Sequence, residues 1–96
     1  MTPDTDTLME NLKNEGFNFV CVDTDEPGKT YPPHTDQGDT ALIILEGEMT
    51  FTMDNASRIL HPLDRMDIPS GKLHEAVTGK EGCRYVYGAK SAKLIK

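Results

Sequence analysis

A histidine and an aspartate at alternate positions give this chain its clearest indication of chemistry. His34, Asp36 and Thr40 all stand at even-numbered positions. Side chains alternate along a β-strand, so these three would point to the same side if the strand is unbroken. Imidazole and carboxylate groups suit divalent Fe, Mn, Ni and Zn as ligands. The spacing therefore predicts that these polar side chains converge on one face of the strand.

Other kinds of catalytic site are not indicated. The sequence contains no G-x-S-x-G motif, no phosphate-binding loop and no Ser-His-Asp arrangement, so covalent catalysis is not expected. Cys21 and Cys83 lack the C-x-x-C spacing of zinc and redox motifs. We interpret both as buried thiols in a reducing compartment.

Charge and hydropathy argue against two classes of partner. The chain has 96 residues and a net charge of −6, and its Lys and Arg residues are scattered, so we expect no nucleic acid partner. The longest apolar run, Ala41 to Leu45, is too short to cross a bilayer, and no signal pattern precedes it. We therefore predict no membrane partner and a cytoplasmic location.

A short helix is predicted at the start, over residues 1–16. Thr7 to Glu10 has the pattern of a capping box, and Leu8, Met9 and Leu12 share one face. Gly16 supplies the stop signal. This is the only segment with a helical pattern.

The elements that must position the candidate site are strands. From Phe17 the pattern has period two, with Phe17, Phe19 and Cys21 on one side. Residues 23–33 contain three prolines, which predicts a loop that delivers His34 to the next strand. Ala41 to Leu45 is apolar on both faces, as in a strand buried within a barrel or sandwich.

The remaining pattern predicts several short strands separated by turns. Turns are expected at Glu46–Gly47, at Asp54–Asn55 and over residues 79–82. The strands between them cover residues 48–53, 58–60, 66–68, 74–78 and 83–88. Short strands at this spacing predict an all-β sandwich or closed barrel, which we place at 17–90 as a single domain, with a C-terminal tail over 91–96.

Two stretches resemble the paired motifs of the cupin superfamily. The first motif, G-x5-H-x-H-x3-E-x6-G, is matched in spacing from Gly28 to Gly47, with Asp36 at the second histidine and Thr40 at the glutamate. The second, G-x5-P-x-G-x2-H-x3-N, is matched at three positions: Pro69, Gly71 and His74. Leu63 stands at its initial glycine and Thr78 at its asparagine.

The resemblance implies a fold, a site and an assembly. The fold would be the double-stranded β-helix, or jelly-roll barrel, and the protein would pair as a homodimer through its sheets. Family members with intact motifs hold a divalent metal with three histidines and a glutamate. By position, His34, Asp36 and His74 would supply three ligands here, and Asp39 or Thr40 would lie near the glutamate position.

The departures from the motif leave two alternatives at that position. Thr40 is a poor ligand because its neutral hydroxyl offers little charge to a cation. Asp39 would point outward by strand alternation unless a bulge at Gly38 turned it inward. Asp39 is thus either a metal ligand or a solvated loop residue. Without a metal, His34 and His74 would be pocket residues satisfied by Asp36 and by backbone groups.

Several apolar and aromatic residues are candidates for binding a ligand. Phe51 and Met53 belong to a strand-period stripe that could form either the pocket wall or simply core. Tyr87 could orient a ligand with its phenol or pack with its hydroxyl at the surface. Thr40 would face the same cavity.

Two functions remain open from the sequence. One is a metal-dependent enzyme, which by resemblance would be a dioxygenase or isomerase acting on a small organic molecule. The other is a metal-free barrel that binds or senses a small ligand without catalysis, which the loss of a histidine and the glutamate favours.

Overall fold

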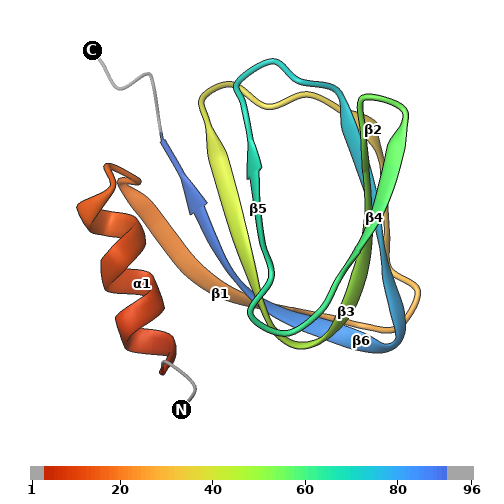
Figure 1. The fold of residues 1–96 in the computed structure, drawn as a ribbon, viewed down its shortest axis with the longest axis horizontal. Coiled ribbons are helices and arrows are strands. Elements are labelled where there is room, and N and C mark those ends of the chain that lie inside the picture. Colours follow the sequence, from red (N-terminus) through yellow and green to blue (C-terminus); the bar gives the residue numbers. More distant parts are fainter. Residues whose placement is uncertain (1–3, 91–96) are drawn as a thin grey trace.

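The computed structural model describes residues 4–90, so the predicted tail at 91–96 lies outside the described residues. The described chain contains one helix and six strands (Figure 1). Their bounds are α1 Thr5–Asn14, β1 Phe19–Asp25, β2 Thr30–His34, β3 Thr40–Met53, β4 Ala56–Leu60, β5 Arg65–Ile68 and β6 His74–Ala89.

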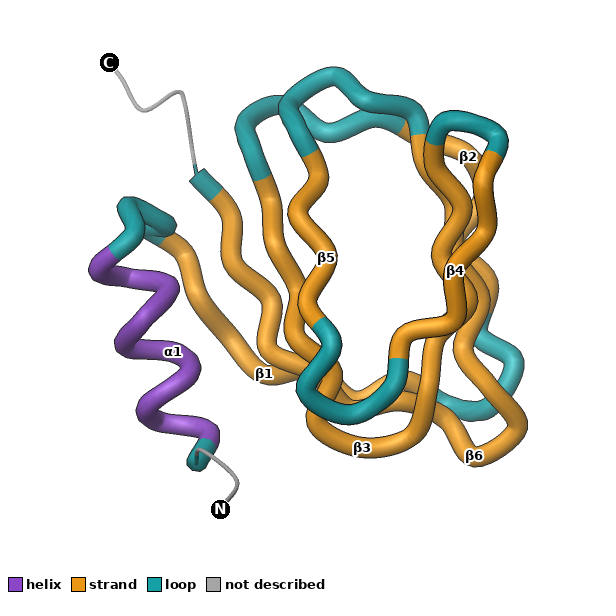
Figure 2. Tube along the Cα trace, in the orientation of Figure 1, coloured by secondary structure: helices purple, strands orange, loops and turns teal. Residues whose placement is uncertain are grey.

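All strand pairings are antiparallel, and the two long strands β3 and β6 connect the others. The hydrogen-bonded order is β1-β6-β3-β4, with β2 also on β6 and β5 also on β3. Figure 2 shows the strands curling round a common interior, with α1 outside them. The predicted all-β barrel with one short N-terminal helix is confirmed.

β3 and β6 each continue through a place where a turn was predicted. The turns expected at Glu46–Gly47 and over residues 79–82 are wrong: both strands run on, with register shifts on either side of Gly47. Gly47 and Gly82 have φ of +77° and +79°, and a Cβ on Gly47 would overlap the Gly82 carbonyl oxygen. The two glycines therefore let the paired strands bend together at a corner without ending.

The predicted loop over residues 23–33 is also partly wrong. β1 continues to Asp25, and Thr30–His34 forms a strand despite Pro32 and Pro33. Among residues 4–90, strand β2 pairs only with β6, and its register shifts between Tyr31 and His34, where the prolines lie. Proline is tolerated at such an irregularity because regular ladder hydrogen bonding is interrupted there.

The start of the chain packs differently from its pattern. Asp4, not Thr7, caps α1, and its carboxylate accepts a hydrogen bond from the Thr7 backbone N–H. Phe17 precedes β1 and is buried with Leu8 and Leu12, whereas Phe19 is 53% exposed. Phe17 and Phe19 therefore do not share a face. None of the described helices is long and apolar enough to span a membrane.

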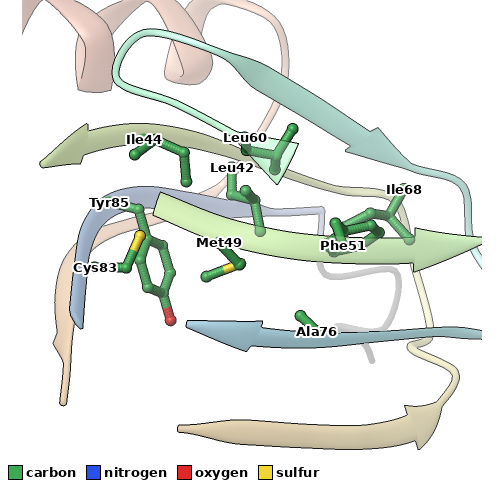
Figure 3. Packing of buried hydrophobic residues seen from close by; sticks show 9 residues of the cluster. All are labelled: Leu42, Ile44, Met49, Phe51, Leu60, Ile68, Ala76, Cys83 and Tyr85. Carbon is green, nitrogen blue, oxygen red and sulfur yellow. The ribbon is translucent and has the colours of Figure 1, made fainter. Parts of the chain in front are cut away.

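The apolar segment Ala41 to Leu45 packs on both faces, as its composition predicted. Ala41 and Ile43 face the cluster beneath α1, while Leu42 and Ile44 face the interior of the barrel. Figure 3 shows the interior cluster, which Leu42 and Ile44 form with Met49, Phe51, Leu60, Ile68, Ala76, Cys83 and Tyr85. This cluster forms the floor on which the candidate site rests.

Candidate metal centre

Three candidate ligands meet at one end of the barrel. His34 ends β2, His74 begins β6, and the two are register partners; Asp36 follows in the loop after β2. His74 Nε2 lies 3.3 Å from Asp36 Oδ2, and His34 Nε2 lies 3.9 Å from Asp36 Oδ1. One ligand atom from each residue can be chosen so that all lie within 4.8 Å of one another.

Both histidines are oriented by backbone carbonyls. His34 Nδ1 lies 2.7 Å from the Pro32 carbonyl oxygen, and His74 Nδ1 lies 2.8 Å from that of Lys72. A carbonyl can only accept, so each Nδ1 carries the proton and donates it. In the neutral rings the Nε2 lone pairs are then directed towards Asp36, which is the tautomer that metal-binding histidines use.

The site is closed on one side and open on the other. His74 is 5% exposed, and its ring stacks on Phe51 with centroids 5.5 Å apart. The side chains of His34 and Asp36 are 38% and 33% exposed. Three protein ligands at such a rim leave coordination positions for a bound molecule.

The structure places Asp39 away from this group. β2 ends at His34 and β3 begins at Thr40, so the single unbroken strand assumed from the sequence does not exist. Gly38 does adopt a left-handed backbone, with φ of +87°. However, the Asp39 carboxylate accepts a hydrogen bond from the Ser70 backbone N–H at 2.9 Å. This contact ties two loops together, and Asp39 lines a different hollow from the one that His34, Asp36 and His74 share.

Thr40 does face the candidate site. It is 2% exposed, and its Oγ1 has no hydrogen-bond partner among residues 4–90. It lines the same cavity as His34, Asp36 and His74. A buried hydroxyl without a partner is costly, so the Thr40 hydroxyl is a candidate for a hydrogen bond to a molecule that reaches it.

The cavity has a volume of about 200 Å³, and it includes most of the residues predicted to bind a ligand. Phe51 and Tyr87 line it together with Thr40. Met53 does not: it packs against the edge of the interior cluster and borders a separate surface hollow near the β3–β4 turn. Met53 is the last residue of β3, and it lies beyond the part of the strand that lines the cavity.

Sequence reasoning, which had placed Tyr85 and Tyr87 on one face, missed that Tyr31 joins them in the same cavity. The hydroxyls of Tyr31 and Tyr85 both donate to Asp25 Oδ2, at 2.7 and 2.9 Å. Burial raises the pKa of both phenols, and the hydrogen bonds with Tyr31 and Asp25 raise the pKa of Tyr85 further. Both hydroxyls therefore keep their protons at neutral pH. The prolines after Tyr31 hid its strand.

Comparison with known proteins gives consistent matches of fold. The model of the Cupin domain family matches residues 21–87. No curated protein matches the chain in sequence. Three of the similar solved structures are described next, and this chain spans about two thirds or less of the length of each.

The first is a protein of unknown function from Rhizobium leguminosarum, with a TM-score of 0.68 and 21% identity over 73% of this chain and 66% of that one. The second is KdgF from Halomonas sp., with a TM-score of 0.64 and 18% identity, and the match covers 73% of this chain and 66% of that one. The third is the DMSP lyase DddQ from Ruegeria pomeroyi, with a TM-score of 0.67 and 27% identity, and the match covers 79% of this chain and 40% of that one.

Proposed function

The chain belongs to the cupin domain family, whose model covers residues 21–87, and from this premise we propose that it binds a divalent metal with His34, Asp36 and His74. A small organic molecule would bind beside the metal, in the cavity that Thr40, Phe51 and Tyr87 also line. We further propose that the protein forms a homodimer.

The arrangement of two imidazoles around one carboxylate carries the proposal. Each Nδ1 lies against a carbonyl oxygen, and each Nε2 lies on the side of Asp36; with the rings neutral, each Nε2 carries a lone pair. Two Nε2 lone pairs and a carboxylate would then face one another within 4.8 Å. Like-signed partial charges at this separation repel, and a divalent cation would offset the repulsion at all three atoms at once.

Two histidines and one carboxylate fit non-haem Fe(II), and they also fit Mn, Ni or Zn. A metal bound there would act as a Lewis acid or redox centre. The chain's own residues would orient the bound molecule through the Thr40 hydroxyl and keep water from one side with Phe51. Dioxygenation or isomerisation of a small organic molecule is the reaction class we propose.

One observation favours a second candidate, a metal-free ligand-binding barrel. Thr40 stands where the family's motif has a glutamate, so the site lacks the fourth ligand. In that case Thr40, His34 and His74 would hydrogen-bond the ligand directly.

Metal analysis of tag-free protein separates the two candidates. We expect about one equivalent of metal per chain, and a higher melting temperature on adding Fe(II), Mn(II), Ni(II) or Zn(II). Both effects should disappear in the His34→Ala, His74→Ala double variant. They should persist in His61→Ala, which removes the chain's third histidine from an exposed position.

A second matched pair tests the carboxylate. Asp36→Asn should weaken metal binding by about ten- to a hundredfold or more, because a neutral amide ligates poorly. Asp39→Asn should leave metal binding unchanged, since that carboxylate contacts Ser70 instead. Absence of metal and of any thermal shift in the unaltered protein would exclude the metal site and leave the metal-free barrel.

A further inference from the structure

All three tyrosines of the chain face one cavity. The sequence contains three tyrosines and no tryptophan, and Tyr31, Tyr85 and Tyr87 all line the cavity beside the candidate metal ligands. They come from β2 and β6, and Phe51 adds a fourth aromatic ring from β3. The faces of aromatic rings carry partial negative charge, so these rings would attract a cation.

Hydrogen-bond donors are scarce among the groups near these rings. The Tyr31 and Tyr85 protons both point at Asp25, so the lone pairs of the two phenol oxygens remain as acceptors. Asp23, the register partner of Tyr85, also lines the cavity and adds a carboxylate. A ligand group bound against Tyr31, Tyr85 and Asp23 would therefore gain most from carrying donors of its own.

The lining contains carboxylates but, among the described residues, no lysine or arginine. Asp23 and Asp36 line the cavity, and no lysine or arginine from residues 4–90 does so. The ring of Tyr31 already attracts an ammonium group, since the exposed Lys29 Nζ lies 5.3 Å from its centroid. A metal ion would offset Asp36, whereas Asp23 and the hydrogen-bonded Asp25 would keep this part of the cavity negative.

We propose that the cavity selects a small organic ammonium compound, held by Asp23 and the rings of Tyr31, Tyr85 and Tyr87. The same molecule would carry a hydroxyl or other oxygen donor for the metal. The contact between the ligand's oxygen and the metal rests on the proposed function. The binding of the ammonium group does not, because the residues that would hold it include no metal ligand.

The chemistry of the wall argues against the other ligand classes. A phosphorylated or carboxylated molecule needs cationic or N–H donors to offset its charge, and the described lining offers no lysine or arginine. A neutral polyol could donate to the same acceptors, but it has no positive charge for the carboxylate or the ring faces to attract. A comparison of matched ligands therefore tests the inference.

The experiment is a titration followed by tyrosine fluorescence, which reports on the cavity because every tyrosine lines it. The probes are 3-amino-1-propanol, 1,3-propanediol and 3-hydroxypropanoate, which share a hydroxyl and differ in charge. In metal-free protein we expect the amine to bind about tenfold more tightly than the diol, as a charge-assisted contact would give, and the carboxylate to bind weakest.

Variants assign the selectivity to the cavity. Asp23→Asn should lower the preference for the amine over the diol by about fivefold or more, and this exposed side chain can be replaced without disturbing the core. Glu10→Gln removes the same charge from the exposed surface of α1 and should leave the preference unchanged. Equal affinities for amine and diol, tighter binding of the carboxylate, no saturable change with the amine, or an unchanged preference in Asp23→Asn would each overturn the inference.

Repeating the titration with Zn(II)-treated protein separates the two proposals. If no metal binds but the amine preference persists in the metal-free protein, the metal site fails and the ligand class stands. If metal binds stoichiometrically but the amine shows no preference, the ligand class fails and the metal site stands.

Discussion

Replacing Gly47 by alanine should destabilise the protein much more than replacing Gly28 by alanine. Both glycines have a left-handed backbone, with φ of +77° and +70°. An L-residue in this region costs roughly 1–2 kcal/mol, so both variants lose that amount. They differ in what the new methyl group meets: at Gly28 nothing lies within 4 Å, whereas at Gly47 it would overlap the Gly82 carbonyl oxygen.

The overlap sets the size of the difference. The Gly82 atom is backbone and cannot rotate away, so β3 and β6 would have to separate at their shared corner. Overpacking of this kind costs about 1–3 kcal/mol, and alanine regains roughly 0.4–1 kcal/mol by restricting the unfolded chain. We therefore expect a loss of about 1 kcal/mol for Gly28→Ala and about 3 kcal/mol for Gly47→Ala.

Urea unfolding followed by tyrosine fluorescence and circular dichroism measures both losses. In thermal melts each kcal/mol corresponds to a decrease of about 4–8 °C in a domain of this size, so the two variants should be well separated. If the losses agree within about 0.5 kcal/mol, the close approach of the two strands does not constrain residue 47, and our account of the corner is refuted.

Two further predictions concern polar groups of the cavity. Thr40→Val should leave the free energy of unfolding unchanged or raise it by up to about 1 kcal/mol, because the buried hydroxyl has no partner among the described residues; a clear loss in urea titrations would show that the hydroxyl is satisfied within the protein. Alkaline pH should destabilise the protein: burial raises the pKa of Tyr85 in the folded state, whereas the unfolded chain ionises near pH 10. The stabilisation is therefore complete below about pH 10 and is lost as the pH rises further, and Tyr85→Phe should make this loss shallower in urea midpoints measured between about pH 7 and pH 11. An equally steep loss in Tyr85→Phe would contradict the assignment.

Local sequence patterns identified which segments are strands better than where the strands end. The turns expected at Glu46–Gly47 and over 79–82 rested on glycine and charged residues that elsewhere mark loops. In the structure the glycines serve a tertiary contact between two bent strands. No pattern within either segment reveals that the other lies against it, so a corner and a turn cannot be told apart from the sequence alone.

The alternation rule placed the candidate ligands in one cavity, although its premise was wrong. His34 and Thr40 belong to different strands, and Asp36 lies in the loop between them. What brings the group together is the pairing of His34 with His74 and the carbonyl contacts that orient both rings. The position of Asp39 could not be predicted, because its partner Ser70 belongs to a loop that is far away in the sequence.

Leu63 shows how a motif can keep its backbone after losing its residue. It stands where the family's second motif has glycine, and its φ of +74° is the left-handed conformation that favours glycine. Its backbone N–H donates to the Ile44 carbonyl at 2.7 Å, so a tertiary hydrogen bond holds the turn despite the side chain. Spacing between motif positions thus reports backbone geometry, which tolerates substitution at some strain. The chemistry of the site depends instead on residue types, and those are the feature in which this chain departs from its family.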